Sequence, residues 1–396
     1  MKFIFIVLFS VSVLFGAKVT DVGSKFQDSQ KCKACHIHLV KDWEKSWHSK
    51  SHYKNDEYFR ATINYVKRKT RKSLNSVKIK CATCHNPRVS VTTTSADYEI
   101  DAVMGFDKDS KINKALESDI INEGINCVVC HNIDKIHSNA DETKRGINRI
   151  EWTKTGLMSG PYDDASSPYH KVEYRDFMSK KSNQLCFVCH ANDRALKGFV
   201  FSDMQKEYKE NTKLCVDCHM GVKKQGVAAT LRIDNGKQRK REIRAHKFSG
   251  AHTFGMWKDA LELELEQETK NIILTIKNSL PHNIPSGFGS REVIVELAYK
   301  SNGKVLKNKV INLTRYYVSK RGKPTIPHLA VKSSSDLSIP ANGQKSLKVS
   351  NIDGSDEIEV KLYYRLVNDE VRKILKLKEP IWSKKSFITS KSLKLN

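Results

Sequence analysis

The chain has 396 residues, of which 39% are hydrophobic, so it is long enough for more than one domain with a buried core. Lys and Arg outnumber Asp and Glu by 69 to 44, which gives a formal net charge of +25. Beyond the N-terminus no segment is apolar enough to span a bilayer, which excludes a protein with several membrane-spanning helices. The charge favours an acidic protein surface, an anionic membrane surface or an anionic substrate as partner.

The first 17 residues predict a secretory signal peptide. Lys2 precedes an apolar run that extends to Ala17, and a short basic segment followed by such a run is typical of an export signal. The run is shorter than the ~20 residues that a spanning helix needs, so an uncleaved anchor is the second interpretation. We therefore expect a periplasmic protein, and export argues against nucleic acid as a partner.

A Cys-x-x-Cys-His motif occurs five times and uses all ten cysteines. This motif is the attachment signature of c-type haem, in which both thiols bond to the haem and the histidine becomes the proximal iron ligand. Zinc sites and redox dithiols also use Cys-x-x-Cys, but neither explains a histidine after each second cysteine. The sequence therefore predicts five covalently bound haem c groups. The cysteines are Cys32, Cys35, Cys81, Cys84, Cys127, Cys130, Cys186, Cys189, Cys215 and Cys218, and the proximal histidines are His36, His85, His131, His190 and His219.

The residues between the signal peptide and position 256 predict one domain, mostly helical and irregular. The motifs lie so close together that separate domains around each haem are excluded, and the haems are expected to share one core. The shortest interval between motifs separates Cys186 from Cys215, so the fourth and fifth haems are expected to be neighbours. One longer helix is expected between Lys41 and Lys69, and a hairpin is expected around Asp234-Asn235-Gly236.

From about Trp257 the pattern changes to β structure. Ala260–Leu265 alternates apolar and charged side chains, and Ser301-Asn302-Gly303 is a turn signal between two later apolar runs. Further strands are expected over Ile272–Ile276, Val293–Tyr299, Leu347–Val349 and Ile358–Tyr364. The predicted fold class is α+β in two domains: a multihaem domain over 18–256 and an all-β, immunoglobulin-like sandwich over 257–396.

The residues around the motifs resemble the multihaem cytochromes grouped with cytochrome c-554, and the C-terminal part resembles a sandwich often appended to them. The matching segments are Trp43-x-x-Ser46-x-His48, Glu123-Gly124-Ile125-x-Cys127, Gly160-Pro161 with His170, Cys218-His219-Met220, His246-x-Phe248-x-Gly250-x-His252, and Pro281-His282-x-Ile284-Pro285-x-Gly287 followed by Arg291. The resemblance implies closely stacked haems, mostly with two histidine ligands, and electron transfer. The namesake of the family has four haems, whereas this chain has five motifs. Pentahaem nitrite reductases usually carry lysine in their active-site motif, so a typical nitrite reductase is disfavoured here.

The sixth ligand of each iron decides between an electron carrier and an enzyme. A second histidine gives a low-spin carrier, whereas an open position gives a place for chemistry. The chain has 14 histidines, so enough remain outside the motifs to saturate all five irons. The predicted distal ligands are His48, His137, His170, His246 and His252, with His52 and His282 as alternates. His38 is judged too near its own motif and His328 too remote.

Two functions stay open from the sequence, and no catalytic residue is assigned. The first is a periplasmic cytochrome that carries electrons between redox proteins of a respiratory chain, including a membrane complex that oxidises quinol. The second is a reductase that acts on a small nitrogen or sulfur oxo-species at one open haem. The C-terminal domain is expected to be structural or to dock a partner. The basic clusters Lys67–Lys72 and Lys237–Arg244 could dock an acidic partner, although a solvated face or pairing with haem propionates is the favoured interpretation of each.

Overall fold

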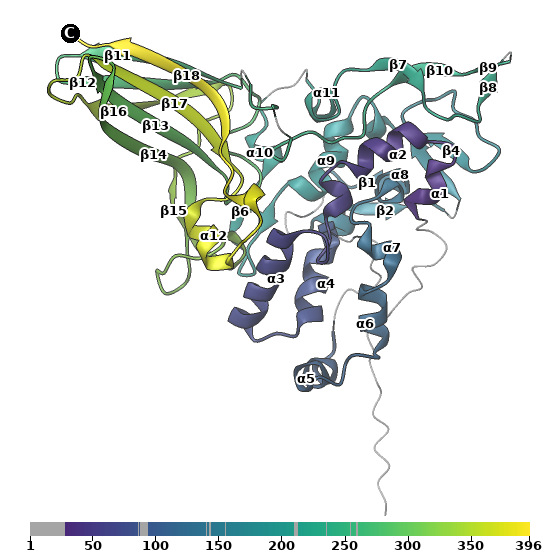
Figure 1. Cartoon of the computed structure of the whole chain (residues 1–396). Helices are drawn as coiled ribbons and strands as arrows, with labels where there is room; N and C mark the ends of the chain where they lie inside the picture. Colours follow the sequence, from purple (N-terminus) through teal and green to yellow (C-terminus); the bar gives the residue numbers. More distant parts are fainter. Residues whose placement is uncertain are drawn as a thin grey trace, which may run out of the picture.

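The computed structural model of the chain describes residues 28–396 except 86, 88–93, 140, 142–143, 155, 210–212, 235, 254 and 259. The predicted signal peptide lies outside the described residues. Figure 1 shows two packed parts, which we call the N-terminal region (residues 28–256) and the C-terminal region (residues 257–396). The first combines short helices with small sheets and the second consists mainly of long strands, so the chain is α+β as predicted.

The N-terminal region carries all five motifs on or beside short helices. Its helices are α1 (Ser29–Lys33), α2 (Ile37–Glu44), α3 (Glu57–Thr70), α4 (Leu74–His85), α5 (Ala96–Met104), α6 (Lys111–Leu116), α7 (Asp119–Asn122), α8 (Cys127–His131), α9 (Ser182–His190), α10 (Met204–Glu207) and α11 (Cys215–His219), with 3₁₀ turns η1 (His48–Lys50), η2 (Gly146–Arg149) and η3 (Asp176–Met178). Among the described residues no helix is both long and apolar enough to cross a bilayer.

The loops of this region contain short strands, which form hydrogen-bonded pairs. They are β1 (Ile133–Ile136) with β2 (Ile150–Trp152), β3 (Leu157–Gly160) parallel to β4 (Lys171–Tyr174), β5 (Asp193–Arg194) with β6 (Val200–Ser202), β7 (Lys224–Val227) with β10 (Lys240–Ile243), and β8 (Ile233–Asp234) with β9 (Lys237–Gln238). The last two pairs form the predicted hairpin, in which Gly236 has a φ of +73°.

The single helix expected between Lys41 and Lys69 is wrong. The chain instead leaves α2 at Glu44, makes the 3₁₀ turn η1 and begins α3 at Glu57. The physical reason is a new helix start, because the Asp56 side chain accepts a hydrogen bond from the Phe59 amide and caps α3. His48 and His52 therefore do not share one helical face.

The C-terminal region contains two antiparallel sheets. One has the strand order β11-β12-β16 and the other β15-β14-β13-β17-β18. Five of these strands lie where the apolar runs predict them, whereas β14, β15 and β18 were not predicted. The elements are β11 (Leu261–Glu268), β12 (Asn271–Asn278), β13 (Glu292–Ser301), β14 (Lys304–Val318), β15 (Lys332–Asp336), β16 (Gly343–Ser350), β17 (Glu357–Arg365) and β18 (Ser386–Lys394), with α12 (Asp369–Leu375) and the turns η4 (Pro327–Leu329) and η5 (Pro380–Trp382).

The two regions share one apolar core. Buried residues of both sheets, such as Leu274 of β12 and Val295 of β13, belong to the same cluster as Ile63 of α3. The carboxylate of Glu57 accepts hydrogen bonds from three donors of the C-terminal region: the Lys378 amide (2.8 Å), the Glu379 amide (2.9 Å) and the Trp382 indole (2.7 Å). The start of α3 therefore fixes the C-terminal region against the motif-bearing part.

Candidate functional site

Each Cys-x-x-Cys-His motif presents its two thiols and its imidazole from a helix or a turn. α8 and α11 consist of a whole motif, whereas α4 and α9 end at the histidine of theirs. In a helix, residues three and four positions apart lie on one face. The backbone of the motifs therefore has the arrangement that covalent haem attachment requires.

Three of the motif histidines are oriented by a hydrogen bond that their Nδ1–H donates. The partners are carbonyl oxygens of distant segments: Ala228 for His36 (2.7 Å), Ser159 for His131 (2.7 Å) and Ser249 for His219 (2.5 Å). A carbonyl oxygen only accepts, so Nδ1 must carry the proton in these three rings. This tautomer leaves the Nε2 lone pair for a metal, which is how metal-binding histidines are usually held.

Each of four motif histidines faces a second histidine, and the distance between the two rings is nearly the same in all four pairs. The ring centroids are 6.4 Å apart for His36 and His170, 6.3 Å for His190 and His48, 6.4 Å for His131 and His246, and 6.4 Å for His219 and His282. Two imidazoles that bind one metal ion from opposite sides have centroids about 6 Å apart, because each metal–nitrogen bond is about 2 Å long and each ring adds about 1 Å. At four motifs the donor set of the chain thus fits a haem iron, which the two facing histidines would hold between them.

Burial keeps three of these imidazoles neutral. It lowers the pKa of His48 to about 3 and the pKa of His131 and of His190 to about 4. Neighbouring histidines add to the effect, as does Arg291 at His190, whereas the hydrogen bond to the Ser159 carbonyl opposes it at His131. A neutral imidazole is the form that donates its lone pair to a metal.

A glycine explains how His48 is held in place. The Ile125 amide donates to the His48 carbonyl over 3.0 Å, and Gly124 before it has a φ of +68°. A Cβ at Gly124 would collide with the backbone of His48 and Ser51. The segment Glu123-Gly124-Ile125 thus passes directly against the turn that presents His48.

His282 reaches its partner from the C-terminal region. It lies in the loop between β12 and β13, where the Asn278 side chain donates to its carbonyl over 2.9 Å. Its Nδ1 is 3.0 Å from the Asn283 carbonyl, so this ring has the same tautomer as the motif histidines. From the sequence it is only an alternate ligand, because no local pattern shows that this loop folds back onto the fifth motif.

The other predicted distal ligands lie elsewhere. His137 is half-exposed, with Nε2 2.8 Å from a carboxylate oxygen of Glu151. His252 stacks on the Trp47 indole, with centroids 3.8 Å apart and ring planes 8° from parallel. His52 is buried, and its Nδ1 accepts from the Lys54 amide over 3.1 Å.

The second motif has different surroundings. The His85 ring stacks on Phe59 with centroids 4.1 Å apart, and its Nδ1 lies 2.9 Å from the Ser51 hydroxyl. Burial, and then the charge of His190, lowers the pKa of His85 to about 4. A further histidine of the C-terminal region, His328, lies within electrostatic range of His85.

His328, whose place in the sequence suggests that it is too remote, lies on η4 between two aromatic rings. The centroids of Phe201 and Phe288 are 5.0 Å and 5.7 Å from its own. Burial lowers its pKa to about 3, with smaller contributions from His85 and Arg145. Among the described residues its buried Nδ1 has no hydrogen-bond partner. No sequence signal marks this residue, because only the packing of the two regions brings it here.

The motifs lie beside one another in space. Side chains of the first and third motifs meet at Cys32 and Cys127, and the fourth and fifth meet at Cys186 and Cys215. The second and fourth motifs meet through the thiols of Cys84 and Cys189. Cys130 of the third motif also lies within electrostatic range of Cys186 and Cys189 of the fourth, so the five motifs are connected through the region.

Comparison with known proteins shows the fold. No family model and no curated protein matches the chain. The structure is similar to a penta-heme cytochrome c552 from Thermochromatium tepidum, with a TM-score of 0.69 and 18% identity over 94% of this chain and 99% of that one. A superoxide reductase also aligns, over 35% of this chain and 87% of that one at 12% identity, but its TM-score of 0.17 is too low to support an argument. The chain therefore has the fold of a multihaem c-type cytochrome along nearly its whole length.

Proposed function

We propose that the chain binds five haem c groups covalently and carries electrons between redox proteins. The observation that carries this proposal is the set of four facing histidine pairs, because two imidazoles on one iron give a low-spin haem suited to electron transfer. The fold of a penta-heme cytochrome over 94% of the chain supports it. Bound haem iron supplies reversible one-electron chemistry, and the chain supplies the rest.

The side chains of the protein hold, orient and shield these groups. The ten cysteines anchor them, and the Nδ1 hydrogen bonds of His36, His131 and His219 fix the direction of the proximal imidazoles. We propose His170, His48, His246 and His282 as the distal ligands of the first, fourth, third and fifth motifs. The contacts between neighbouring motifs support electron passage between the haems.

We also propose a cellular location for the protein and a family of cytochromes to which it is related. The apolar N-terminus supports export to the periplasm, and a place in a respiratory chain, with acidic redox proteins or a quinol-oxidising membrane complex as partners, agrees with the charge of +25. The motif order supports a place among the cytochrome c-554 relatives. The two sheets around one apolar core support an immunoglobulin-like sandwich in the C-terminal region.

A second function rests on a separate observation, which is the position of His328 near the second motif. A neutral imidazole between two aromatic rings, with a buried Nδ1 and close to the second motif, can exchange a proton or a hydrogen bond with a small anion bound there. We propose reduction of a small nitrogen or sulfur oxo-species beside the second motif as the alternative to a pure carrier.

The spin state of the second haem separates the two functions. In the purified holoprotein, electron paramagnetic resonance that shows five low-spin haems supports the carrier. One high-spin haem that binds carbon monoxide when reduced supports the reductase, provided that turnover of nitrite or hydroxylamine falls in His328→Gln and not in His38→Gln. Fewer than five haems by intact mass, with free thiols or bound zinc, would contradict both functions.

A further inference from the structure

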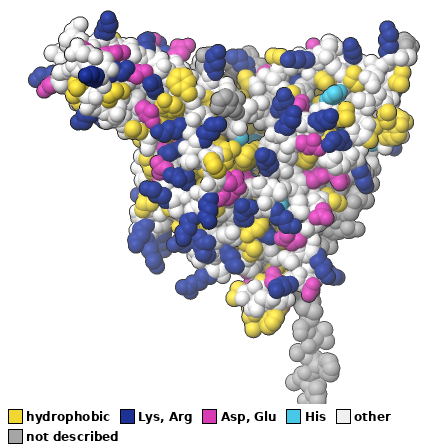
Figure 2. Space-filling view, in the orientation of Figure 1, with side chains coloured by type: hydrophobic (Ala, Val, Ile, Leu, Met, Phe, Trp, Pro, Cys, Tyr) yellow, Lys and Arg dark blue, Asp and Glu magenta, His cyan; other side chains and the backbone are white. Residues whose placement is uncertain are grey.

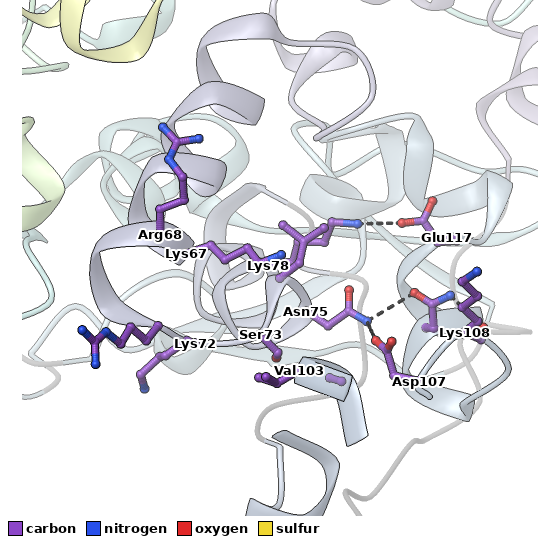
Figure 3. Close-up of a pocket in the computed structure, with 14 residues that line it drawn as sticks. Lys67, Arg68, Lys72, Ser73, Asn75, Lys78, Val103, Asp107, Lys108 and Glu117 are labelled. Carbon is purple, nitrogen blue, oxygen red and sulfur yellow. Dashed lines mark hydrogen bonds and ion pairs between the residues drawn. The ribbon is translucent and has the colours of Figure 1, made fainter. Parts of the chain in front are cut away.

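A basic pocket lies away from the paired histidines, between the helices α3 and α4 on one side and α5 and α6 on the other. Its volume is about 550 Å³ (Figure 3). Two carboxylates face it, but both are engaged: Glu117 pairs with Lys78 (2.6 Å) and Lys54 (3.1 Å), and Asp107 accepts from Tyr98 and Asn75. The cations that line it are Lys67, Arg68, Arg71, Lys72, Lys78 and Lys108.

Most of these cations are not neutralised within the protein. Among the described residues, Lys67, Arg68, Arg71 and Lys72 form no ion pair with a carboxylate, and all four are exposed. Like charge is crowded here, because Lys72 contributes, after burial, to lowering the pKa of Lys80. A concentrated positive charge of this kind attracts an anionic partner.

An apolar tip lies next to the cations. Ile100, Val103 and Met104 are 60%, 71% and 62% exposed, and their spacing places them on one face of α5. Gly105 ends the helix with a φ of +84°, and Phe106, which follows it, is 72% exposed. Figure 2 shows hydrophobic side chains at the lower tip of the molecule, where Figure 1 places α5, with Lys and Arg side chains above them.

Large apolar side chains that gather on a surface mark an interaction site. α5 itself carries Asp97, Glu99 and Asp101 and no cation, so the positive charge beside its apolar face comes from neighbouring segments, mainly α3 and the loop after it. Apolar side chains next to such cations are the chemistry of peripheral membrane binding, in which cations meet anionic headgroups and apolar side chains enter the interface. A redox partner fits less well. Four large apolar side chains at this tip suit insertion into a bilayer interface, whereas an acidic redox protein would be matched by the cations alone.

We propose that Ile100, Val103, Met104 and Phe106, together with Lys67, Arg68, Arg71 and Lys72, form a surface that binds an anionic phospholipid bilayer. We call it the α5 surface. The apolar side chains enter the interfacial layer, and the cations contact lipid phosphates. The protein is thereby held at a membrane while the motif-bearing core stays in the aqueous phase.

Vesicle sedimentation of the mature, haem-loaded protein tests this proposal. Phosphatidylcholine vesicles are compared with vesicles that also contain phosphatidylglycerol, at low and high salt. We expect binding to the anionic vesicles that weakens with salt. Each Lys near such a surface contributes about fivefold to partitioning, so Lys67→Gln with Lys72→Gln lowers it about 25-fold. We expect Val103→Ser with Phe106→Ser to lower it about tenfold.

Matched control variants lie on β14 of the C-terminal region. Val305 and Val310 are also exposed, and Lys307 and Lys309 lie beside them. Val305→Ser with Val310→Ser, and Lys307→Gln with Lys309→Gln, should leave vesicle binding unchanged. Equal losses in the controls, or binding that ignores anionic lipid, would overturn the proposal. So would saturation of the surface by inorganic phosphate alone, or binding only to an acidic redox protein. The haem absorption spectrum should be the same in every variant, so the result is independent of the electron-transfer proposal.

Discussion

The two regions of the molecule are stabilised in different ways. The C-terminal region buries its own apolar side chains, and Ile272, Leu274 and Ile276 of one sheet are fully buried. Among the described residues, the N-terminal region has one small apolar cluster of its own, around Ile79 and Ile121, and α3 contributes Ile63 to the core of the C-terminal region. Apolar strands therefore dominate the packing of one region, whereas the other is organised around its cysteines and histidines.

Loss of covalent haem should have the largest effect. Cys127→Ser with Cys130→Ser removes the attachment of the third haem, and loss of so large an apolar group from a shared core destabilises the N-terminal region. Limited proteolysis with mass spectrometry should show cleavage throughout residues 28–256 and protection of the strands from Leu261 onward. A soluble protein with four haems, normal yield and an intact N-terminal region would contradict the difference between the regions.

Gly124→Ala should have the next largest effect. The new Cβ collides with the backbone of His48 and Ser51, and φ at this position is +68°, so the cost is about 3–5 kcal/mol. One haem should change from low to high spin, because the turn that carries His48 is displaced. Gly156→Ala is the matched control: φ there is +82°, but nothing lies near the new Cβ, so the cost is about 1 kcal/mol. Equal effects of the two variants would show that the contact with His48 is unimportant.

Glu57→Ala tests how the two regions are joined. The variant leaves the Lys378 and Glu379 amides and the Trp382 indole without their acceptor, so we expect a loss of about 3 kcal/mol. Thermal unfolding should separate into two transitions, one for each region. Glu266→Ala, at a position of β11 outside the apolar core, serves as the control and should leave the unfolding curve unchanged. A single transition at the wild-type temperature in Glu57→Ala would show that the junction is held by apolar packing alone.

Acid should weaken the junction by a smaller amount, through His252. Burial, followed by the charges of Arg291 and Lys50, lowers its pKa to about 3 in the folded protein, whereas a free histidine titrates near a pKa of about 6.5. The unfolded state therefore binds the extra proton, and stability is lost as the pH falls from about 6.5 toward 3. Between about pH 7.5 and 5 this site costs about 2 kcal/mol. His252→Phe keeps the ring stack on Trp47 but removes the titrating group. The free energy of unfolding, measured with denaturant, should therefore fall by about 2 kcal/mol less between pH 7.5 and 5 in this variant than in the wild type. An unchanged pH dependence of this free energy would contradict the role of His252.

The sequence predicts the motifs and five of the strands of the C-terminal region, because alternation and spacing are local signals, but it does not predict β14, β15 or β18. Leu261–Glu268 and Glu292–Ser301 form strands where the apolar pattern requires them. It also does not predict the pairings between distant segments. The cap at Asp56 breaks the helix expected around His48, and His282 and His328 reach the motifs only because the C-terminal region packs on α3. Such placements depend on tertiary packing, which periodicity does not report.

The spin state of the haems in His282→Ala tests the proposed ligand pairs more sharply than any other measurement. This residue, from the C-terminal region, is the proposed distal ligand of the fifth haem, with its ring centroid 6.4 Å from that of His219. Electron paramagnetic resonance of the full-length holoprotein should show one haem converted from low to high spin, which then binds carbon monoxide when reduced. His137→Ala, on the surface beside Glu151, should convert none. If His282→Ala leaves every haem in its wild-type spin state, the facing histidine pairs do not identify the iron ligands.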